Sequence, residues 1–303
     1  MSASTAVVHL ARHANGTAPF DAFLASYRSR AAECEHDLVL LLKGFADDRS
    51  RAPYLERCAD LAPVRIEVPD TGLDLAAYFA AAAQLEHERL CFVNSFSEIL
   101  APGWLRLLGA ALDDPRAGAA GATGSWASHR SLALSLLRLP NGYHGSLGDR
   151  SRMAPALRST STAPKLSRPR WAVRAATDLS SDIVTFPGFP APHLRTNAFL
   201  IGRRLLLSLN AGSLAGKRSS YRLEAGHRSL TAQLRRRGLD AVVVSRDGSA
   251  RSPNAWPDGD VFWQGSQEQL LVGDNQTRTY QRGGADVREA LARYAWGPRA
   301  RPG

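Results

Sequence analysis

Cysteine and long apolar runs are scarce in this sequence of 303 residues. The three cysteines, Cys34, Cys58 and Cys91, form no C-x-x-C pair, and two of them stand in apolar runs, which indicates buried free thiols in a reducing compartment. No run of about 18 apolar residues occurs that could cross a membrane. Residues 1–5 are small and polar, without the basic segment that begins a secretory leader. We therefore expect a cytoplasmic protein with at most peripheral membrane contact.

Lysine is also scarce. Only Lys43, Lys165 and Lys217 occur, so arginine carries nearly all of the formal net charge of +10. Such a charge favours a nucleic-acid binder, but richness in both arginine and alanine is as typical of a bacterium with a GC-rich genome. Because the basic stretches contain no interleaved aromatic residues and no nucleic-acid-binding motif, we expect no nucleic-acid partner. Part of the arginine content can still bind phosphate through the planar guanidinium fork.

The first half of the chain alternates between strand-like and helix-like segments. Apolar runs predict strands at residues 6–10, 37–43, 64–68 and 90–93, and helical spacing predicts helices near 20–27, 52–58 and 76–88 between them. This order is typical of an α/β fold with a mostly parallel sheet flanked by helices. With 44% hydrophobic residues the chain can build one large core, so we expect a single domain.

Residues 88–105 carry the most informative pattern. The buried strand at 90–93 is followed by a polar turn at 94–98 and then by Pro-Gly-Trp-Leu at 102–105, which begins a helix. In an open parallel sheet, ligands bind where strands end at their carboxyl side. The stretch resembles the central segment of family 2 glycosyltransferases with the GT-A fold, in which a strand delivers an Asp-x-Asp motif shortly before Pro-Gly-Trp-Leu. Here Asn94 and Phe96 stand at the two aspartates, and Glu98 is the nearest carboxylate.

The resemblance covers roughly residues 6–125 and 193–245. It implies a GT-A-like, Rossmann-like domain with a nucleotide-sugar-binding half at 1–125, a variable acceptor-side insertion at 126–192, an acceptor and catalytic half at 193–250, and a C-terminal tail at 251–303 that ends in a helix. It also implies an inverting transfer from a nucleotide-sugar donor to a glycan, surface-polysaccharide or lipid-linked acceptor.

Several residues are assigned to the donor by this resemblance. Asp70 and Asp74 lie in the loop that in the family precedes an alanine-rich helix, where carboxylates can accept hydrogen bonds from a base or a ribose; alternatively, Asp70 and its neighbour Thr71 only cap the helix. The other candidate donor contacts are Asn94, Ser95, Arg195, Asn197 and Arg228. For residues 195–197 the alternative is an edge strand with solvated polar side chains.

The candidate general base comes from a predicted helix over 221–238, with Leu223, Leu230 and Leu234 on one face. Its Leu-Arg-Arg-Arg-Gly end resembles the helix after the catalytic acidic pair of the family, but Gly226 and His227 occupy the aligned positions. We predict Glu224, two residues earlier, as the base that removes the acceptor proton, with His227 as the second candidate. The alternative for Glu224 is a solvent-facing side chain stabilised by a helix dipole.

Because the two aspartates are missing, the sequence does not decide whether a metal ion takes part in the reaction. Most family members neutralise the departing diphosphate with a divalent ion such as Mn2+ or Mg2+, which prefers carboxylate oxygens. Either Glu98 with water ligands holds a weakly bound ion, or arginines such as Arg195, Arg222 and Arg228 carry the positive charge, and we favour the metal-independent alternative. The missing motif equally suits a catalytically inactive binding or scaffold protein.

The tail adds two open questions. Trp256, Phe262 and Trp263 lie in a polar loop, where they either stack on a sugar or cover a core. Asp274 and Asn275 are candidates for the acceptor side.

Overall fold

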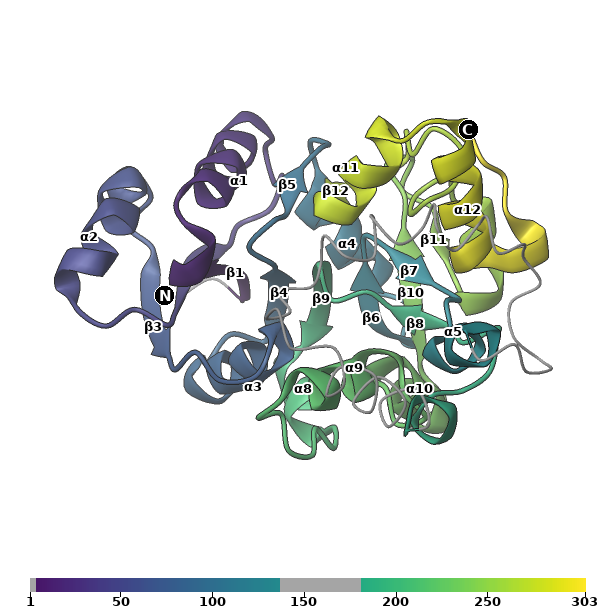
Figure 1. The fold of residues 1–303 in the computed structure, drawn as a ribbon. Helices are drawn as coiled ribbons and strands as arrows, with labels where there is room; N and C mark the ends of the chain where they lie inside the picture. The colour runs from purple at the N-terminus through teal and green to yellow at the C-terminus, as the bar shows by residue number, and fades with distance from the viewer. Residues whose placement is uncertain (1–3, 137–180) are drawn as a thin grey trace, which may run out of the picture.

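A computed structural model of the chain describes residues 4–136 and 181–303. One eight-stranded sheet organises these residues, in the order β11-β10-β6-β9-β4-β1-β2-β3 (Figure 1). Its strands are β1 (Thr5–Arg12), β2 (Asp37–Lys43), β3 (Val64–Val68), β4 (Arg89–Val93), β6 (Ala117–Gly121), β9 (Ala198–Gly202), β10 (Asp240–Val244) and β11 (Ala250–Arg251).

The sheet is mostly parallel. Strands β1, β2, β3 and β4 run parallel to one another, and β6 is parallel to β10. Strand β9 is antiparallel to both β4 and β6, and β11 is antiparallel to β10. The predicted fold class, an α/β domain with a mostly parallel sheet flanked by helices, is confirmed. The short strands β5 (Glu98–Ile99), β12 (Val272–Gly273), β7 (Gly124–Ser125) and β8 (His193–Leu194) form two small antiparallel pairs.

Helices cover both faces of the sheet because its central strands are apolar on both sides. One face packs on α1 (Ala18–Ser29), α2 (Asp48–Arg57) and α4 (Trp104–Ala111). The other packs on α3 (Asp74–Gln84), α8 (Arg203–Ser208), α9 (Lys217–Ala225), α10 (Leu230–Arg236), α11 (Asn275–Arg282) and α12 (Ala285–Trp296). Further helical elements among the described residues are α5 (His129–Leu136), a helical stretch at 181–185, and short 3-10 turns at His13–Asn15, Ala59–Leu61, Pro253–Asp258 and Gly297–Arg299.

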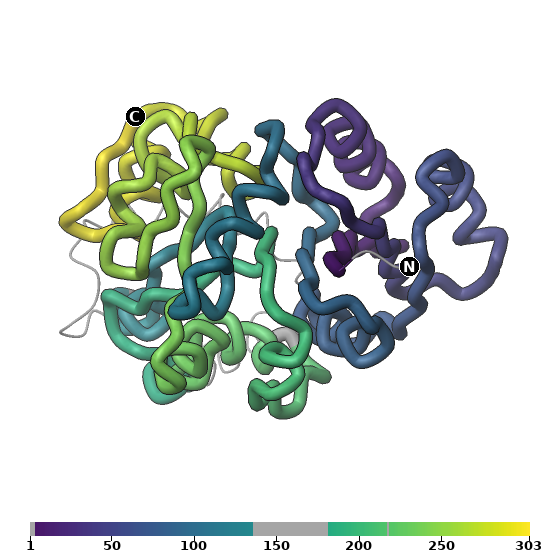
Figure 2. The backbone as a smooth tube through the Cα atoms, turned by 180° about the vertical axis from the view of Figure 1, so that it is seen from behind, coloured from purple at the N-terminus to yellow at the C-terminus, as the bar shows by residue number. Residues whose placement is uncertain are grey.

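The C-terminal segment closes one end of the core. Figure 2 shows the yellow C-terminal chain beside the light-green chain that follows β10. Trp256, Phe262 and Trp263 are at most 3% exposed, and the indole of Trp296 donates to the carbonyl of Phe262 at 2.7 Å. Of the two alternatives for these aromatic residues, the structure therefore supports a core role.

The predicted single helix over 221–238 is wrong in one respect. The structure breaks it into α9 and α10 at Gly226, whose backbone is extended (φ −79°, ψ 177°). A side chain at Gly226 would approach the carbonyl oxygen of Arg222 to 2.6 Å, so the chain turns closely there. Ser229 then begins α10 by accepting a hydrogen bond from the amide of Ala232. Both helices keep their leucines in the core.

One of the alternatives is excluded, and one expectation needs correction. Strand β9 lies between β4 and β6 instead of at an edge of the sheet. Cys58 and Cys91 are buried free thiols as expected, but Cys34 is exposed. Of the predicted insertion at 126–192, residues 137–180 lie outside the described ranges. Within 4–136 and 181–303, no helix is both long enough and apolar enough to cross a bilayer.

Candidate functional site

The strand order places a ligand-binding edge next to β1. The chain leaves β1 for β2 and β3 on one side and returns to β4 on the other, which makes the junction of β1 and β4 a topological switch point. Ligands of open α/β sheets bind outside the carboxyl ends of the strands at such a point. Arg12, Lys43, Val68 and Val93 end these four strands and mark that edge.

Arg12 and Asp70 form a bidentate ion pair across this edge. The Arg12 Nε and Nη2 atoms lie 2.8 and 2.9 Å from the two carboxylate oxygens of Asp70. This hydrogen bonding lowers the pKa of Asp70, and it raises the pKa of Arg12. Asp70, predicted from the sequence, is thus a charged residue at the edge, and its partner Arg12 was not predicted.

Lys43 organises the loop that carries Asp74. Its ammonium group is buried and donates to the carbonyls of Gly72 and Leu73 at 2.9 and 3.1 Å. Burial lowers the pKa of Lys43 and raises the pKa of Asp74 to about 6, a rise that Lys43 opposes and Glu224 reinforces. Asp74 therefore titrates near neutral pH. The alternative that this loop only caps α3 does not hold, because Leu73 is the N-cap and makes no side-chain cap bond.

Glu224 approaches the same loop from α9. Its Oε1 accepts hydrogen bonds from the amide and the hydroxyl of Thr196 at 3.2 and 3.1 Å. The loop before α3 is tied to the start of α9, since Gly72 N donates to Ala215 O at 3.2 Å. Glu224 lies in the last turn of α9, half-buried, so it is not the solvent-facing residue near a helix N-terminus that we considered. The structure brings Glu224 and Asp74 together within electrostatic reach.

An aromatic side chain, Tyr221, lies beside these two carboxylates. Burial raises the pKa of Tyr221 to about 12, with further contributions from Glu224 and Asp74. Tyr221 therefore stays neutral and offers a phenol next to the carboxylate pair. It belongs to α9, one turn before Glu224.

His227 and Arg228 do not join this group. Both are exposed in the turn between α9 and α10, where the amide of His227 donates to Thr185 O at 3.4 Å. Arg228 lines a separate pocket beside α10. Their assignments as second base and donor contact stay predictions without support from this arrangement.

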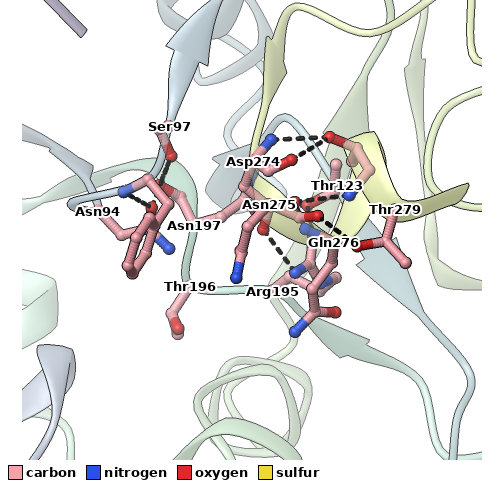
Figure 3. Close-up of polar contacts among 12 residues, drawn as sticks. Asn94, Ser97, Thr123, Arg195, Thr196, Asn197, Asp274, Asn275, Gln276 and Thr279 are labelled. Carbon is pink, nitrogen blue, oxygen red and sulfur yellow. Dashed lines mark hydrogen bonds and ion pairs between the residues drawn. The ribbon is translucent and has the colours of Figure 1, made fainter. Parts of the chain in front are cut away.

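The turn after β4 is held by its own side chains (Figure 3). The Asn94 side-chain oxygen accepts from Phe96 N at 3.0 Å and from Ser97 Oγ at 2.9 Å. Asn94 N donates to Asn197 O at 2.8 Å, and Ser95 Oγ donates to Leu10 O at 2.7 Å, so the turn is fastened to β9 and β1. Asn197 is 2% exposed, and its side-chain nitrogen has no hydrogen-bond partner among the described residues.

Arg195 lies in a buried ion pair (Figure 3). Its Nη2 is 2.7 Å from Asp274 Oδ2, with side chains only 8% and 2% exposed, and its guanidinium lies 4.0 Å from the centre of the Phe262 ring. The other oxygen of Asp274 accepts from the amides of Gln276 and Thr277 and caps α11. The charge of Arg195 is thus already compensated, and Asp274 acts as cap and counter-ion.

Glu98 is paired as well. Its carboxylate lies 2.7 Å from Arg278 Nη1, and Arg278 Nη2 donates to Phe96 O at 3.1 Å. In the described ranges no group of three His, Cys, Asp or Glu side chains is placed to hold a metal. An amide oxygen that accepts two hydrogen bonds and one paired carboxylate do not fit a divalent cation at the end of β4.

Three charged residues near the site, Arg12, Lys43 and Arg278, were not predicted from the sequence, although the sequence carried a signal for the first two. Arg12 and Lys43 are the charged residues that end buried strands, which places them at the carboxyl edge. Arg278 had no such signal, because only the folded chain brings it to Glu98, 180 positions away.

Comparison with known proteins gives only distant likenesses. No family model and no curated protein matches the sequence. Residues 1–349 of S. aureus TarS with UDP-GlcNAc share 16% identity over 40% of this chain and 33% of that one, with a TM-score of 0.31. Glucosyl-3-phosphoglycerate synthase from Mycobacterium tuberculosis with Mn2+, UDP and phosphoglyceric acid shares 16% over 68% and 57%, with a TM-score of 0.36.

A third solved structure is the mannosyltransferase PcManGT from Pyrobaculum calidifontis in complex with GDP-Man and Mn2+. It shares 15% identity over 44% of this chain and 41% of its own, with a TM-score of 0.31. The chain thus spans from about a third to less than two thirds of the length of these proteins. Likenesses this partial assign no activity, so the function rests on the site itself.

Proposed function

We propose that this chain is a glycosyltransferase that moves a sugar, with inversion, from a nucleotide-sugar donor to a glycan or lipid-linked acceptor. The observation that carries the proposal is the convergence of Glu224 with the Asp74 loop at the carboxyl edge of the sheet. In this proposal residues 1–125 bind the donor, residues 193–250 supply the base, and the described parts of 126–192 border the acceptor.

Glu224 is the general base of the proposed reaction. It takes the proton of the acceptor hydroxyl while that oxygen bonds to the anomeric carbon. The bond from this carbon to the donor phosphate breaks on the opposite side, and the diphosphate leaves with the electron pair. Thr196 holds Glu224 through two hydrogen bonds to one carboxylate oxygen, which leaves the second oxygen for the proton.

Arginine supplies the positive charge in this proposal, because the residues at the end of β4 do not fit a metal ion. Arg278 is the cation at that position, and Arg12 is the cation at the end of β1. A guanidinium can hold a diphosphate by paired hydrogen bonds. All three arginines have a carboxylate partner, but the Arg195 side chain is 8% exposed, against 33% for Arg12 and 25% for Arg278, so Arg195, which we had expected in this role, is the least accessible to a ligand.

Calorimetry with UDP-, GDP- and dTDP-sugars, followed by transfer assays with and without a chelator, tests the proposal. We expect one donor class to bind and turnover to survive chelation. Glu224→Gln should leave donor affinity nearly unchanged and lower the transfer rate by about 10² to 10⁴. Glu268→Gln, which makes the same change at an exposed position, is the control and should retain full activity.

Other results would redirect the proposal. Full activity in Glu224→Gln would move the base elsewhere, with His227 as the next candidate. Binding without turnover would favour the inactive scaffold that the absent Asp-x-Asp motif suggests. If the protein binds none of these nucleotide-sugars, the assignment as a glycosyltransferase is wrong. Tight binding of oligonucleotides that weakens steeply with salt would restore the nucleic-acid alternative.

A further inference from the structure

A concave site lies beside α10, and its lining includes none of the residues at the carboxyl edge. The pocket has a volume of about 470 Å³ and is lined by Asn210, Arg228, Gln233, Arg236 and Arg237. This volume is within the range of roughly 300–1,000 Å³ of small-ligand sites. The lining residues come from α10 and from the segments that follow α8, α9 and α10, and these three helices lie together at the bottom of Figure 1. Of these lining residues only Arg228 was assigned to the donor from the sequence, and none belongs to the group around Asp74 and Glu224.

Gln233 gives this pocket a fixed floor. The side chain is 8% exposed, and its oxygen accepts from Asn210 N at 2.8 Å. Its nitrogen donates to Asn210 O at 3.0 Å and to Arg228 O at 2.9 Å. One buried carboxamide therefore ties the segment after α8 to the start of α10, which holds both walls of the pocket in place.

Two of the arginines are also oriented by the backbone. Arg237 Nη2 donates to Ser208 O at 2.7 Å, and Arg236 Nη1 donates to His227 O at 3.2 Å. Each of these guanidinium groups has five N–H donors, so most of the donors remain available to a ligand.

Among the described residues, the three arginines of the pocket have no carboxylate partner, although the nearby Arg218 pairs with Asp182. Residues 203–239 contain nine Arg or Lys and a single carboxylate, Glu224, which is bonded to Thr196. Among ion pairs between described residues, none includes Arg228, Arg236 or Arg237, whereas Arg195 and Arg278 each have a carboxylate partner. Three like charges around one hollow repel each other, and an anion between them would relieve that repulsion.

We propose that this pocket binds a phosphate group of an anionic ligand. Planar guanidinium forks match the geometry of phosphate oxygens, and three of them can surround one phosphate or diphosphate. The phosphate can belong to a soluble phosphate ester or to a phospholipid headgroup. Leu207, 39% exposed on α8 beside the Ser208 that holds Arg237, would meet the apolar part of a lipid.

Two probes test the proposal and separate the sources. Calorimetry with pyrophosphate measures the soluble source, and co-sedimentation with phosphatidylcholine vesicles, with or without phosphatidylglycerol, measures the headgroup. The pocket variant is Arg228→Gln with Arg236→Gln. Its matched control is Arg30→Gln with Arg282→Gln, two exposed arginines remote from the pocket that also have no ion pair with a described residue.

The pocket variant should lose about tenfold or more in affinity for the probe that binds, since each substitution removes charge-assisted hydrogen bonds to the phosphate. The control variant should bind like the wild type. Arg12→Gln, at the carboxyl edge, should lower only any pyrophosphate binding at the proposed donor site and keep the binding that the pocket variant loses. A loss of all pyrophosphate and vesicle binding in Arg12→Gln, with none in the pocket variant, would assign the probes to the donor site and overturn the proposal. Equal losses in the pocket and control variants would overturn the proposal, as would a wild-type protein that binds neither probe.

Discussion

Replacing Asp274 with asparagine removes one charge from a buried ion pair while keeping the shape of the side chain. Asp274 Oδ2 lies 2.7 Å from Arg195, and Oδ1 accepts from the amides of Gln276 and Thr277. The new carboxamide could keep the cap on α11, but the guanidinium of Arg195 would remain buried without a counter-charge. We expect Asp274→Asn to lower the free energy of unfolding by about 3–5 kcal/mol. Asp274→Ala should lose about 1 kcal/mol more, because it also removes the cap.

A matched pair exists on the same molecule. Glu98 and Arg278 are also 2.7 Å apart, but their side chains are 32% and 25% exposed, against 2% and 8% for Asp274 and Arg195. Glu98→Gln should therefore cost at most about 1 kcal/mol, because solvent screens the pair and hydrates the remaining charge. The two variants separate the effect of burial from the effect of distance.

Urea unfolding followed by circular dichroism gives these free energies by linear extrapolation. A cycle that adds Arg195→Met to Asp274→Asn should recover most of the loss, since no buried charge is then left unpaired. The reasoning is refuted if Asp274→Asn costs no more than Glu98→Gln, or if Arg195→Met brings no recovery.

Three further predictions concern pH and the donor loop. Burial lowers the pKa of His9 to about 3 and of His193 to about 4, so below pH 6.5 the unfolded state binds more protons than the folded state. As the pH falls below 6.5, the free energy of unfolding should therefore decrease by about 1.4 kcal/mol per pH unit for each histidine. His9→Phe should reduce this slope by one histidine's share in acid titrations of unfolding, whatever its packing cost at pH 7, and an unchanged slope would contradict the assignment. Burial raises the pKa of Asp74 to about 6, so the folded protein favours the protonated carboxyl, and its stability falls as the pH rises toward 6. Asp74→Asn should therefore raise the thermal midpoint at pH 8 but not at pH 4. Gly72→Ala should destabilise the protein more than Gly212→Ala. Both glycines have positive φ (63° and 59°), but only at Gly72 would the new methyl group collide with Leu214 O and the Cβ of Ala76. Equal thermal midpoints of the two variants would argue against this close approach.

The sequence alone predicted the first four long strands and their alternation with helices along the chain. The apolar runs of β1 and β2 and the alternation of strands and helices depend on local periodicity, which is visible without any tertiary contact. The helix over 221–238 shows the limit of this approach. Its leucines predicted the buried face correctly, but the break at Gly226 arises from a close backbone approach that periodicity does not report.

Only the tertiary structure decided which polar residues act together. Asp70 and Glu224 were candidates from the sequence, but Arg12 is the partner of the first and Thr196 of the second. The same holds for Arg195, a predicted donor contact, which the fold pairs with Asp274 in a buried ion pair. The energy of a polar side chain depends on its distance to opposite charge and on how much water remains around it, and both are set by segments far apart in the sequence.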